Sequence, residues 1–282
     1  MDLGRVGVWW SGAWAVKDDP SVDVPAEIES LGYSTAWSSG GFRPGFSPHF
    51  ERLLAGTRQL HVASGIISVW ASEPGDIGAA FHALDAQYPG RFVLGLGASH
   101  SAIVQDYSRP YSRVVGYLDG LDALDQPVPA ERRVLAALGP KMLALAARRT
   151  AGALTYFVPV EHTARARETL GRGPLLAPEV AVVLDDDPAS ARQLARGYAA
   201  IYLPLPNYTQ NLRTFGFGDA DIEGEGSDRL IDAVIPWGNA ETVAGRIREH
   251  FDAGADHVCI QVVADFHNFP LDAYRQLAAQ LL

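Results

Sequence analysis

The sequence contains a single cysteine, Cys259, among its 282 residues. One thiol excludes an internal disulfide and any metal site built from several cysteines. No apolar run approaches the roughly 20 residues that a membrane-spanning helix needs. Residues 1–5 also lack the basic and then apolar layout of a signal peptide. We therefore expect a cytoplasmic protein without a membrane partner.

Basic residues are also scarce, because 23 Lys and Arg stand against 33 Asp and Glu, for a net charge of -10. A surface that binds nucleic acid needs a basic patch, and the sequence shows none, so nucleic acid is excluded as a partner. The chain is 48% hydrophobic and 20% charged. This composition is typical of a globular protein with a large core.

Several chemical signatures are missing as well. The histidines show no metal-ligand spacing and no H-E-x-x-H occurs, so we expect no metal. The sequence contains neither a G-x-S-x-G nucleophile elbow nor a Walker lysine loop. Acyl transfer by that route and nucleotide hydrolysis therefore lose support. Cys259 falls inside a predicted core strand, where a thiol is usually inert.

Strand-like apolar runs alternate with helical patterns along the whole chain. The strands are predicted at residues 6–10, 34–39, 61–70, within 89–100, and at 133–138, 154–158, 180–184 and 257–263. At least one helix follows each strand, and residues 203–226 are predicted as an irregular loop or lid. Eight such units predict an α/β protein whose fold is a (β/α)8 TIM barrel, forming a single domain over residues 1–282. A doubly wound sheet is disfavoured, since no phosphate fingerprint follows the first strand.

The most informative stretch is residues 89–100, which begins with Pro-Gly, continues as a buried strand and ends in small residues followed by His100. Ligands of (β/α)8 barrels bind at the carboxyl ends of the strands. An imidazole placed there can transfer protons near neutral pH, so His100 is the candidate catalytic residue. The alternative is a loop histidine that bonds only to nearby backbone.

Two further motifs are candidate binding elements. In Leu138-Gly139-Pro140-Lys141-Met142 a strand ends in glycine and proline opens a helix. The free N–H groups of that helix start, with Lys141, can bind an anion, although Gly-Pro is also common in ordinary turns. In Ser64-Gly65-Ile66 a glycine within a strand indicates a bulge or close approach to a flat ligand, or simply packing under a helix.

Tryptophans supply the third kind of candidate. Trp9, Trp10, Trp37 and Trp70 all fall late in predicted strands, where they can wall a pocket for a planar group. We assign Trp10, Trp37 and Trp70 to the substrate pocket. Filling of the core is the usual role of such residues and remains the alternative.

Taken together, these motifs resemble those of the luciferase-like flavin and deazaflavin oxidoreductases, in particular an actinobacterial branch that uses the deazaflavin coenzyme F420. The resemblance rests on residues 64–70, 89–100, 138–143 and 253–258, and it covers nearly the whole chain. It implies a TIM barrel, usually a homodimer, with the cofactor ring at the carboxyl mouth and a small-molecule substrate.

The resemblance also implies roles for single residues. Ser64, Gly65 and Ile66 form a bulge behind the cofactor ring, often with a non-prolyl cis peptide bond. Gly97, Ala98 and Ser99 pass beside the ring. The helix start at Gly139, Pro140, Lys141 and Met142 takes the cofactor phosphate. His100 aligns with an acidic residue that serves as an acid in the sugar-phosphate dehydrogenase of this family.

One departure from the family pattern concerns the second strand, which ends in Trp37-Ser38-Ser39-Gly40-Gly41 without the acidic residue or histidine that often contacts the cofactor. We predict an oxidoreductase that transfers a hydride between F420 and a small organic substrate. One alternative is an FMN-dependent monooxygenase of the same fold. The other is a barrel that has lost catalysis and only binds a ligand or a partner protein.

Overall fold

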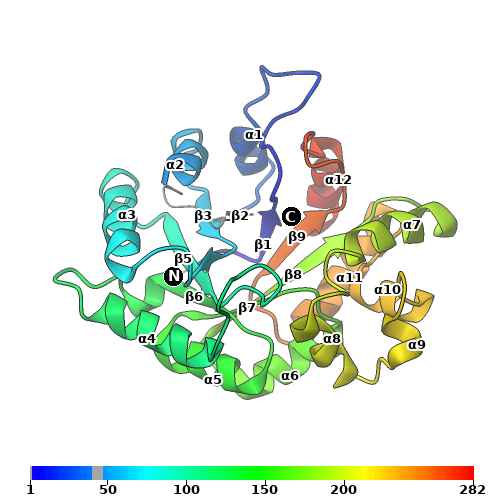
Figure 1. Cartoon of the computed structure of the whole chain (residues 1–282). Coiled ribbons are helices and arrows are strands. Elements are labelled where there is room, and N and C mark those ends of the chain that lie inside the picture. The colour runs from blue at the N-terminus through cyan, green and yellow to red at the C-terminus, as the bar shows by residue number, and fades with distance from the viewer. Residues whose placement is uncertain (1, 40–46) are drawn as a thin grey trace.

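The computed structural model describes residues 2–39 and 47–282, and Gly40 and Gly41 of the motif above lie outside these ranges. Parallel strands form a closed barrel, and helices surround it (Figure 1). The strands are β1 (Val6–Trp9), β2 (Thr35–Ser38), β3 (His61–Ser64), β4 (Ile67–Ser68), β5 (Phe92–Gly97), β6 (Arg133–Ala136), β7 (Gly152–Thr155), β8 (Leu175–Val182) and β9 (Val258–Val262).

β3 and β4 are two pieces of one barrel strand, which confirms the prediction of eight strands. β3 pairs with β5 at Ala63 and Val93, and β4 pairs with β5 at Ile67 and Leu96. Between these two pairs the chain advances by four residues along β3–β4 but by only three along β5. The extra residue makes this a β-bulge. The bulge contains a cis peptide bond between Gly65 and Ile66, as the family resemblance implies.

Helices connect the strands on the outside of the barrel (Figure 1). They are α1 (Val24–Ser30), α2 (Ser47–Ala55), α3 (Pro74–Gln87), α4 (Pro110–Asp122), α5 (Pro140–Arg149), α6 (Val160–Leu170), α7 (Pro188–Ala199), α8 (Pro206–Arg213), α9 (Asp219–Ile222), α10 (Asp228–Val234), α11 (Ala240–Asp252) and α12 (Leu271–Leu281), with a 3-10 turn at Ala130–Arg132. Many begin with proline at the first positions, where its missing N–H costs no hydrogen bond.

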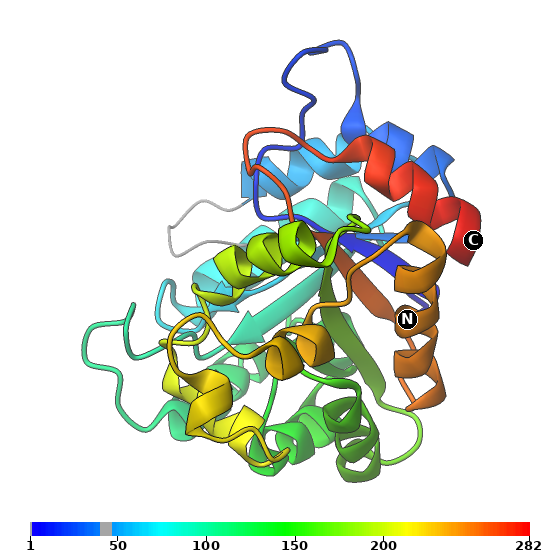
Figure 2. The same cartoon turned by 90° about the vertical axis from the view of Figure 1, so that its right-hand side faces the viewer.

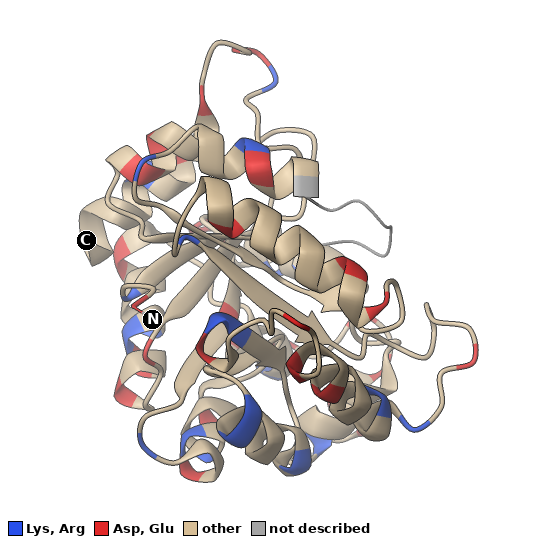
Figure 3. Ribbon diagram, turned by 90° about the vertical axis from the view of Figure 1, so that its left-hand side faces the viewer, with Lys and Arg blue, Asp and Glu red and all other residues tan. Residues whose placement is uncertain are grey.

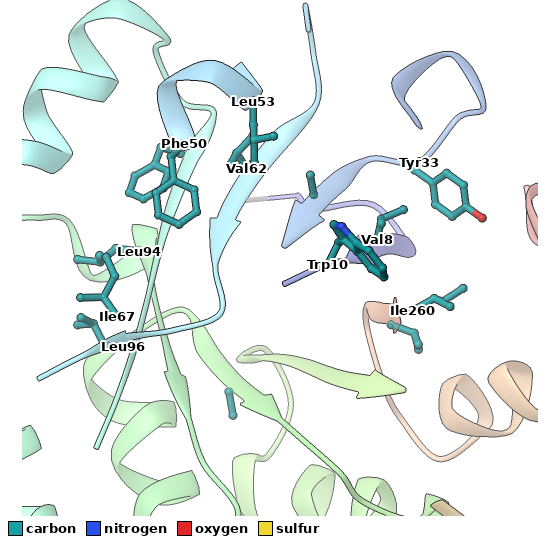
Figure 4. Close-up of a cluster of buried hydrophobic side chains, with 14 of the residues drawn as sticks. Val8, Trp10, Tyr33, Phe50, Leu53, Val62, Ile67, Leu94, Leu96 and Ile260 are labelled. Carbon is teal, nitrogen blue, oxygen red and sulfur yellow. The ribbon is translucent and has the colours of Figure 1, made fainter. Parts of the chain in front are cut away.

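The alternation of side chains along each strand separates two apolar layers. Outward residues such as Val8, Trp10 and Ile260 pack under the helices (Figure 4). Inward residues, among them Trp9 and Trp37, fill the barrel interior. Because successive strand residues point to opposite faces, Trp9 and its neighbour Trp10 belong to different layers.

Two predicted strands begin earlier in the chain than expected. β7 starts at Gly152 rather than at residue 154, and β8 starts at Leu175 rather than at residue 180. Gly152 has φ of 156°, and a side chain there would collide with the backbone of Leu175, so glycine is needed inside this strand. Pro178 lies within β8, and proline is uncommon inside strands, so the sequence pattern misplaced the start.

Residues 203–226 were expected to be irregular, yet they contain α8 and α9. Leu205, Tyr208 and Leu212 of this segment are buried in a second apolar cluster with residues of α7 and α10. Figure 2 shows these helices at the side of the barrel. The segment is therefore a packed part of the fold.

The charged residues lie mainly on the outer helices and their connections (Figure 3). Asp187 caps α7, since its carboxylate accepts hydrogen bonds from the N–H groups of Ala189 and Ser190 at the start of that helix. Within the described residues, no helix is long and apolar enough to cross a membrane.

Candidate active site

A cavity of about 410 Å³ opens at the carboxyl ends of the strands. This volume lies within the range of roughly 300–1,000 Å³ that small-molecule and cofactor sites occupy. Its walls come from nearly every part of the barrel mouth. They are formed by Trp9, Ser11, Ser39, Gly65, Ile66, Ala98, Ser99, His100, Ile103, Tyr107, Ala136, Ala137, Leu138, Met142, Leu154, Tyr156, Ile201, Tyr202, Leu205, Asn207 and Tyr208.

The bulge between β3 and β4 forms one wall. Gly65 and Ile66 line the cavity, and the ring of Trp9 packs so closely against Gly65 that a Cβ there would collide with it. Ser64 lies behind this wall, where its hydroxyl donates to the Gly95 carbonyl (2.9 Å) and accepts from the Gly95 N–H (2.8 Å). Ser64 therefore fastens the bulge to β5 and does not itself line the cavity.

The end of β5 supplies the next wall. Gly97 lies beneath Ile66, and a Cβ on Gly97 would be 3.1 Å from Ile66 Cδ1. Ala98 and Ser99 line the cavity, whereas Gly97 supports Ile66 from behind. Ser99 has φ of 59°, in the left-handed region that non-glycine residues rarely occupy. Its buried hydroxyl makes no hydrogen bond with a described residue, so a ligand can use it.

His100 lies at the rim of this wall, as expected. Its Nδ1 is 3.0 Å from Asn207 Oδ1 of α8, and its ring contacts Tyr208 at a centroid distance of 5.2 Å. Burial lowers the pKa of His100, and the hydrogen bond that the ring donates to Asn207 Oδ1 opposes this effect. The imidazole is thus neutral at pH 7 and able to exchange a proton.

The start of α5 lies at another edge of the cavity. Leu138 and Met142 line it, while Gly139, Pro140 and Lys141 are exposed at the helix start. Gly139 is the N-cap residue of α5. The space beside its Cα is open, since a Cβ added there would meet no atom within 4 Å. An N-terminus with open space above it is suited to an anion.

The prediction for two of the tryptophans is wrong. Trp10 and Trp37 are fully buried and do not line the cavity. Trp10 points outward, where its ring contacts Phe269. Trp37 points inward but lies deeper, and its indole N–H donates to Nε2 of the buried His257 (3.0 Å).

Trp70 lies just behind the cavity. Its indole N–H donates to the carbonyl of Ala98 (2.8 Å), and its ring contacts Tyr107, which lines the cavity. Trp70 thus supports the wall. Trp9 is the tryptophan that lines the cavity directly.

The aromatic wall opposite the bulge was missed by sequence reasoning. Tyr156 follows β7, and Tyr202 and Tyr208 come from the segment between α7 and the end of α8. The hydroxyl oxygens of Tyr156 and Tyr202 are 2.8 Å apart. Tyr156 lies inside the predicted strand at residues 154–158, where nothing indicated that it faces a cavity, and residues 203–226 carried no pattern.

A histidine also reaches the end of β2, where the sequence motif lacks one. His49 of α2 places Nε2 2.8 Å from Ser38 Oγ, next to Ser39, which lines the cavity. Burial lowers the pKa of His49. Among the described residues, no group of three or more His, Cys, Asp or Glu could hold a metal ion.

Comparisons with solved structures show the same fold at low sequence identity. An F420-dependent secondary alcohol dehydrogenase in complex with an F420-acetone adduct matches with a TM-score of 0.74 and 15% identity over 100% of both chains. The F420-dependent tetrahydromethanopterin reductase from Methanopyrus kandleri matches with a TM-score of 0.69 and 15% identity over 99% of both chains.

An FMN-containing structure is similar too. The oxygenating constituent of 3,6-diketocamphane monooxygenase from Pseudomonas putida, in complex with FMN, matches with a TM-score of 0.64 and 16% identity over 97% of this chain and 96% of that chain. No curated protein sequence matches this one. The family model described as luciferase-like monooxygenase matches residues 19–257, which is most of the chain. The chain therefore belongs to the luciferase-like monooxygenase family.

Proposed function

We propose that this protein is an oxidoreductase that transfers a hydride between the deazaflavin F420 and a small organic substrate. The observation that carries this proposal is the cavity itself, in which the bulge, His100 and the start of α5 surround one space. Two of the similar structures, with TM-scores of 0.74 and 0.69, are titled as F420-dependent enzymes, which supports the choice of cofactor.

The residues present fit a ring with a phosphate-bearing tail. Ile66 and Ala98 offer apolar wall to a flat ring, and the unpartnered Ser99 hydroxyl offers it a hydrogen bond. The open space above Gly139 and the exposed Lys141 suit the phosphate. No lysine or arginine among the described residues lines the cavity, so the start of α5 is the element that would recognise the negative charge.

The bound deazaflavin supplies hydride transfer, and the protein supplies position and proton exchange. An amide oxygen only accepts hydrogen bonds, so the contact with Asn207 Oδ1 places the His100 proton on Nδ1. Nε2 then carries the lone pair and accepts a proton from a substrate hydroxyl during oxidation. In the reverse direction the imidazolium returns that proton. The apolar walls exclude water from the reacting atoms.

The experiment that tests the cofactor is a titration of the purified protein with F420 and, in parallel, with FMN. Trp9 lines the cavity, so intrinsic tryptophan fluorescence should respond to a bound ring. We expect saturable quenching by F420 at micromolar concentrations and much weaker quenching by FMN. Tight binding of FMN alone would contradict the proposal.

The family description favours one alternative, an FMN-dependent monooxygenase. Oxygen consumption separates the two, because reduced flavin reacts readily with oxygen whereas reduced deazaflavin reacts poorly. Failure of both cofactors to bind would leave the third reading, a barrel that has lost catalysis and binds a ligand or partner only.

A further inference from the structure

A chain of buried hydroxyl groups leads from the cavity wall into the barrel. Tyr156 lines the cavity, and its hydroxyl is 2.7 Å from the Tyr198 hydroxyl of α7. Tyr198 in turn lies 3.2 Å from Oε1 of Glu179 on β8. Gln261 of β9 closes the group, with Oε1 3.0 Å from the Tyr156 hydroxyl. Four separate elements thus bring these groups together.

With the Gln261 amide oxygen as an acceptor, one arrangement of hydrogens satisfies every contact named above in this group, and also that of the Tyr202 hydroxyl, which then donates to Tyr156 (2.8 Å). When Tyr156 donates to Gln261 Oε1, its oxygen accepts the hydrogen of Tyr198. Tyr198 then has no hydrogen left for Glu179, so the 3.2 Å contact is a hydrogen bond only when Glu179 is the donor. In this arrangement Glu179 is a neutral carboxylic acid.

The surroundings of Glu179 favour that neutral form. The residue is 1% exposed, and its Oε2 makes no hydrogen bond with a described residue. The ionisable groups that share its surroundings are Tyr156, Tyr198, Tyr202, Tyr208, Cys259 and Tyr274. No lysine or arginine is among the groups that shift the pKa of Glu179, which burial raises to about 8.

We propose that Glu179, Tyr198 and Tyr156 form a proton relay, in which Glu179 stores a proton and Tyr156 exchanges it with a molecule bound in the cavity. This inference rests on the proposed function. Hydride transfer between two organic molecules changes the protonation of both: the hydride acceptor gains a proton and the donor loses one. The rings of His100 and Tyr156 both contact the ring of Tyr208, at centroid distances of 5.2 and 6.2 Å. Each of the two residues can therefore exchange a proton with a different one of the two bound molecules.

The transfer balances without any added reagent. The Tyr156 O–H bond breaks as its proton passes to a basic atom in the cavity. Tyr156 takes the proton of Tyr198, and Tyr198 takes the proton of Glu179. Glu179 is left as a carboxylate that accepts a hydrogen bond from Tyr198, and Tyr198 accepts one from Tyr156. Only protons move in these steps, so no group of the protein is oxidised or reduced.

Tyr198 also connects the relay to a second cavity. Together with Gln261 it lines a space of about 320 Å³ beside α7 and the end of β9. This space is separate from the central cavity, and it is the side from which the relay would regain its proton.

The first test uses the ligand-free protein. Infrared spectra of wild type and Glu179→Gln, recorded between pH 5 and pH 9.5, isolate the carbonyl band of one protonated carboxyl group. We expect this band to persist at pH 7 and to disappear near pH 8. A carboxyl group that is already ionised at pH 6 would overturn the relay, whatever the cofactor is.

The second test measures turnover with F420. We expect Tyr198→Phe, which breaks the chain, to lower kcat roughly tenfold or more and to leave KM within about twofold. The solvent deuterium isotope effect should rise in this variant, because proton delivery becomes limiting. Tyr33→Phe is the matched control, since the Tyr33 hydroxyl is also buried but donates to the Tyr274 carbonyl outside the relay.

The two proposals fail in different ways. Equal kcat and isotope effects in Tyr198→Phe and Tyr33→Phe would overturn the relay while the cofactor assignment stands. Absence of turnover and of F420 binding in the wild type would overturn the proposed function. The infrared titration then still decides whether Glu179 stores a proton.

Discussion

At the scale of single residues, the chemistry depends on how His100 is held. Asn207 fixes the ring through Nδ1, and Tyr208 packs against its face. Both partners come from α8, more than 100 positions further along the chain. Burial keeps the pKa of His100 below its ordinary value, so its lone pair on Nε2 is available at neutral pH.

His100→Ala should therefore reduce turnover strongly and affect cofactor binding little. We expect kcat to fall roughly 100-fold or more, as is common when a general acid or base is removed. The dissociation constant for F420 should stay within about threefold. Steady-state kinetics and the fluorescence titration measure both quantities, and His82→Ala is the control, because this histidine of α3 does not line the cavity. Loss of cofactor binding in His100→Ala would assign this residue to binding instead.

At the scale of elements, the start of α5 illustrates a feature that the fold does not require. Gly139 has φ of -83° and ψ of 159°, which any residue can adopt. A Cβ there would meet no atom within 4 Å. Neither backbone geometry nor packing demands glycine at this position, so the helix start has room for the phosphate that we propose to bind there.

Gly139→Ala tests this role of α5. The added methyl group would occupy space that a phosphate needs, so we expect F420 to bind roughly tenfold more weakly, an effect of the size that a helix N-terminus contributes. The melting temperature should fall only slightly, because alanine is a poorer N-cap residue than glycine. Gly245→Ala in α11 serves as the control, because its Cβ also meets no atom within 4 Å and lies away from the cavity. An unchanged affinity of Gly139→Ala for F420 would show that the phosphate does not bind at this site.

At the scale of the whole molecule, burial of ionisable groups sets how stability depends on pH. Burial lowers the pKa of His162 and of His257 to about 4, and that of His250 to about 3. These histidines are neutral in the folded protein, whereas in the unfolded chain they take up a proton below about pH 6.5. The free energy of unfolding is therefore not reduced by them above pH 6.5, and it decreases as the pH falls towards 4. Glu179 acts in the opposite direction, since its folded pKa is about 8.

The free energy of unfolding should therefore be largest near pH 6.5. Glu179 is already ionised in the unfolded chain above its ordinary pKa of 4.5, whereas the folded chain keeps its proton up to about pH 8. This difference costs about 1.4 kcal/mol per pH unit, and above pH 6.5 no gain from the histidines offsets it. We expect Glu179→Gln to remove this decline in denaturant titrations from pH 5 to pH 9. Glu225→Gln, at an exposed glutamate, should retain it. A decline of equal slope in Glu179→Gln would show that another group is responsible.

Much of the candidate site could be predicted because its signals are local. Glycine and proline at residues 138–140 predict a strand end and a helix start, and His100 follows an apolar run that ends in small residues. The glycine within residues 64–66 predicts the bulge. Ser64 and Gly97 belong to the predicted part of the site, but they lie behind the cavity wall and do not line it. Their distance from the cavity depends on how Ile66 and Gly95 pack around them.

The sequence by itself determined the fold, because the alternation of strands and helices is a periodicity that neighbouring residues express. It also determined that His100 ends a strand. Only the tertiary structure decided which tryptophan faces the cavity, because Trp9 and Trp10 differ solely in the side of the strand on which they point. The contacts of His100 with Asn207 and of Tyr156 with Tyr198 join residues far apart in the chain. Closure of the barrel creates these pairs, and no local pattern encodes them.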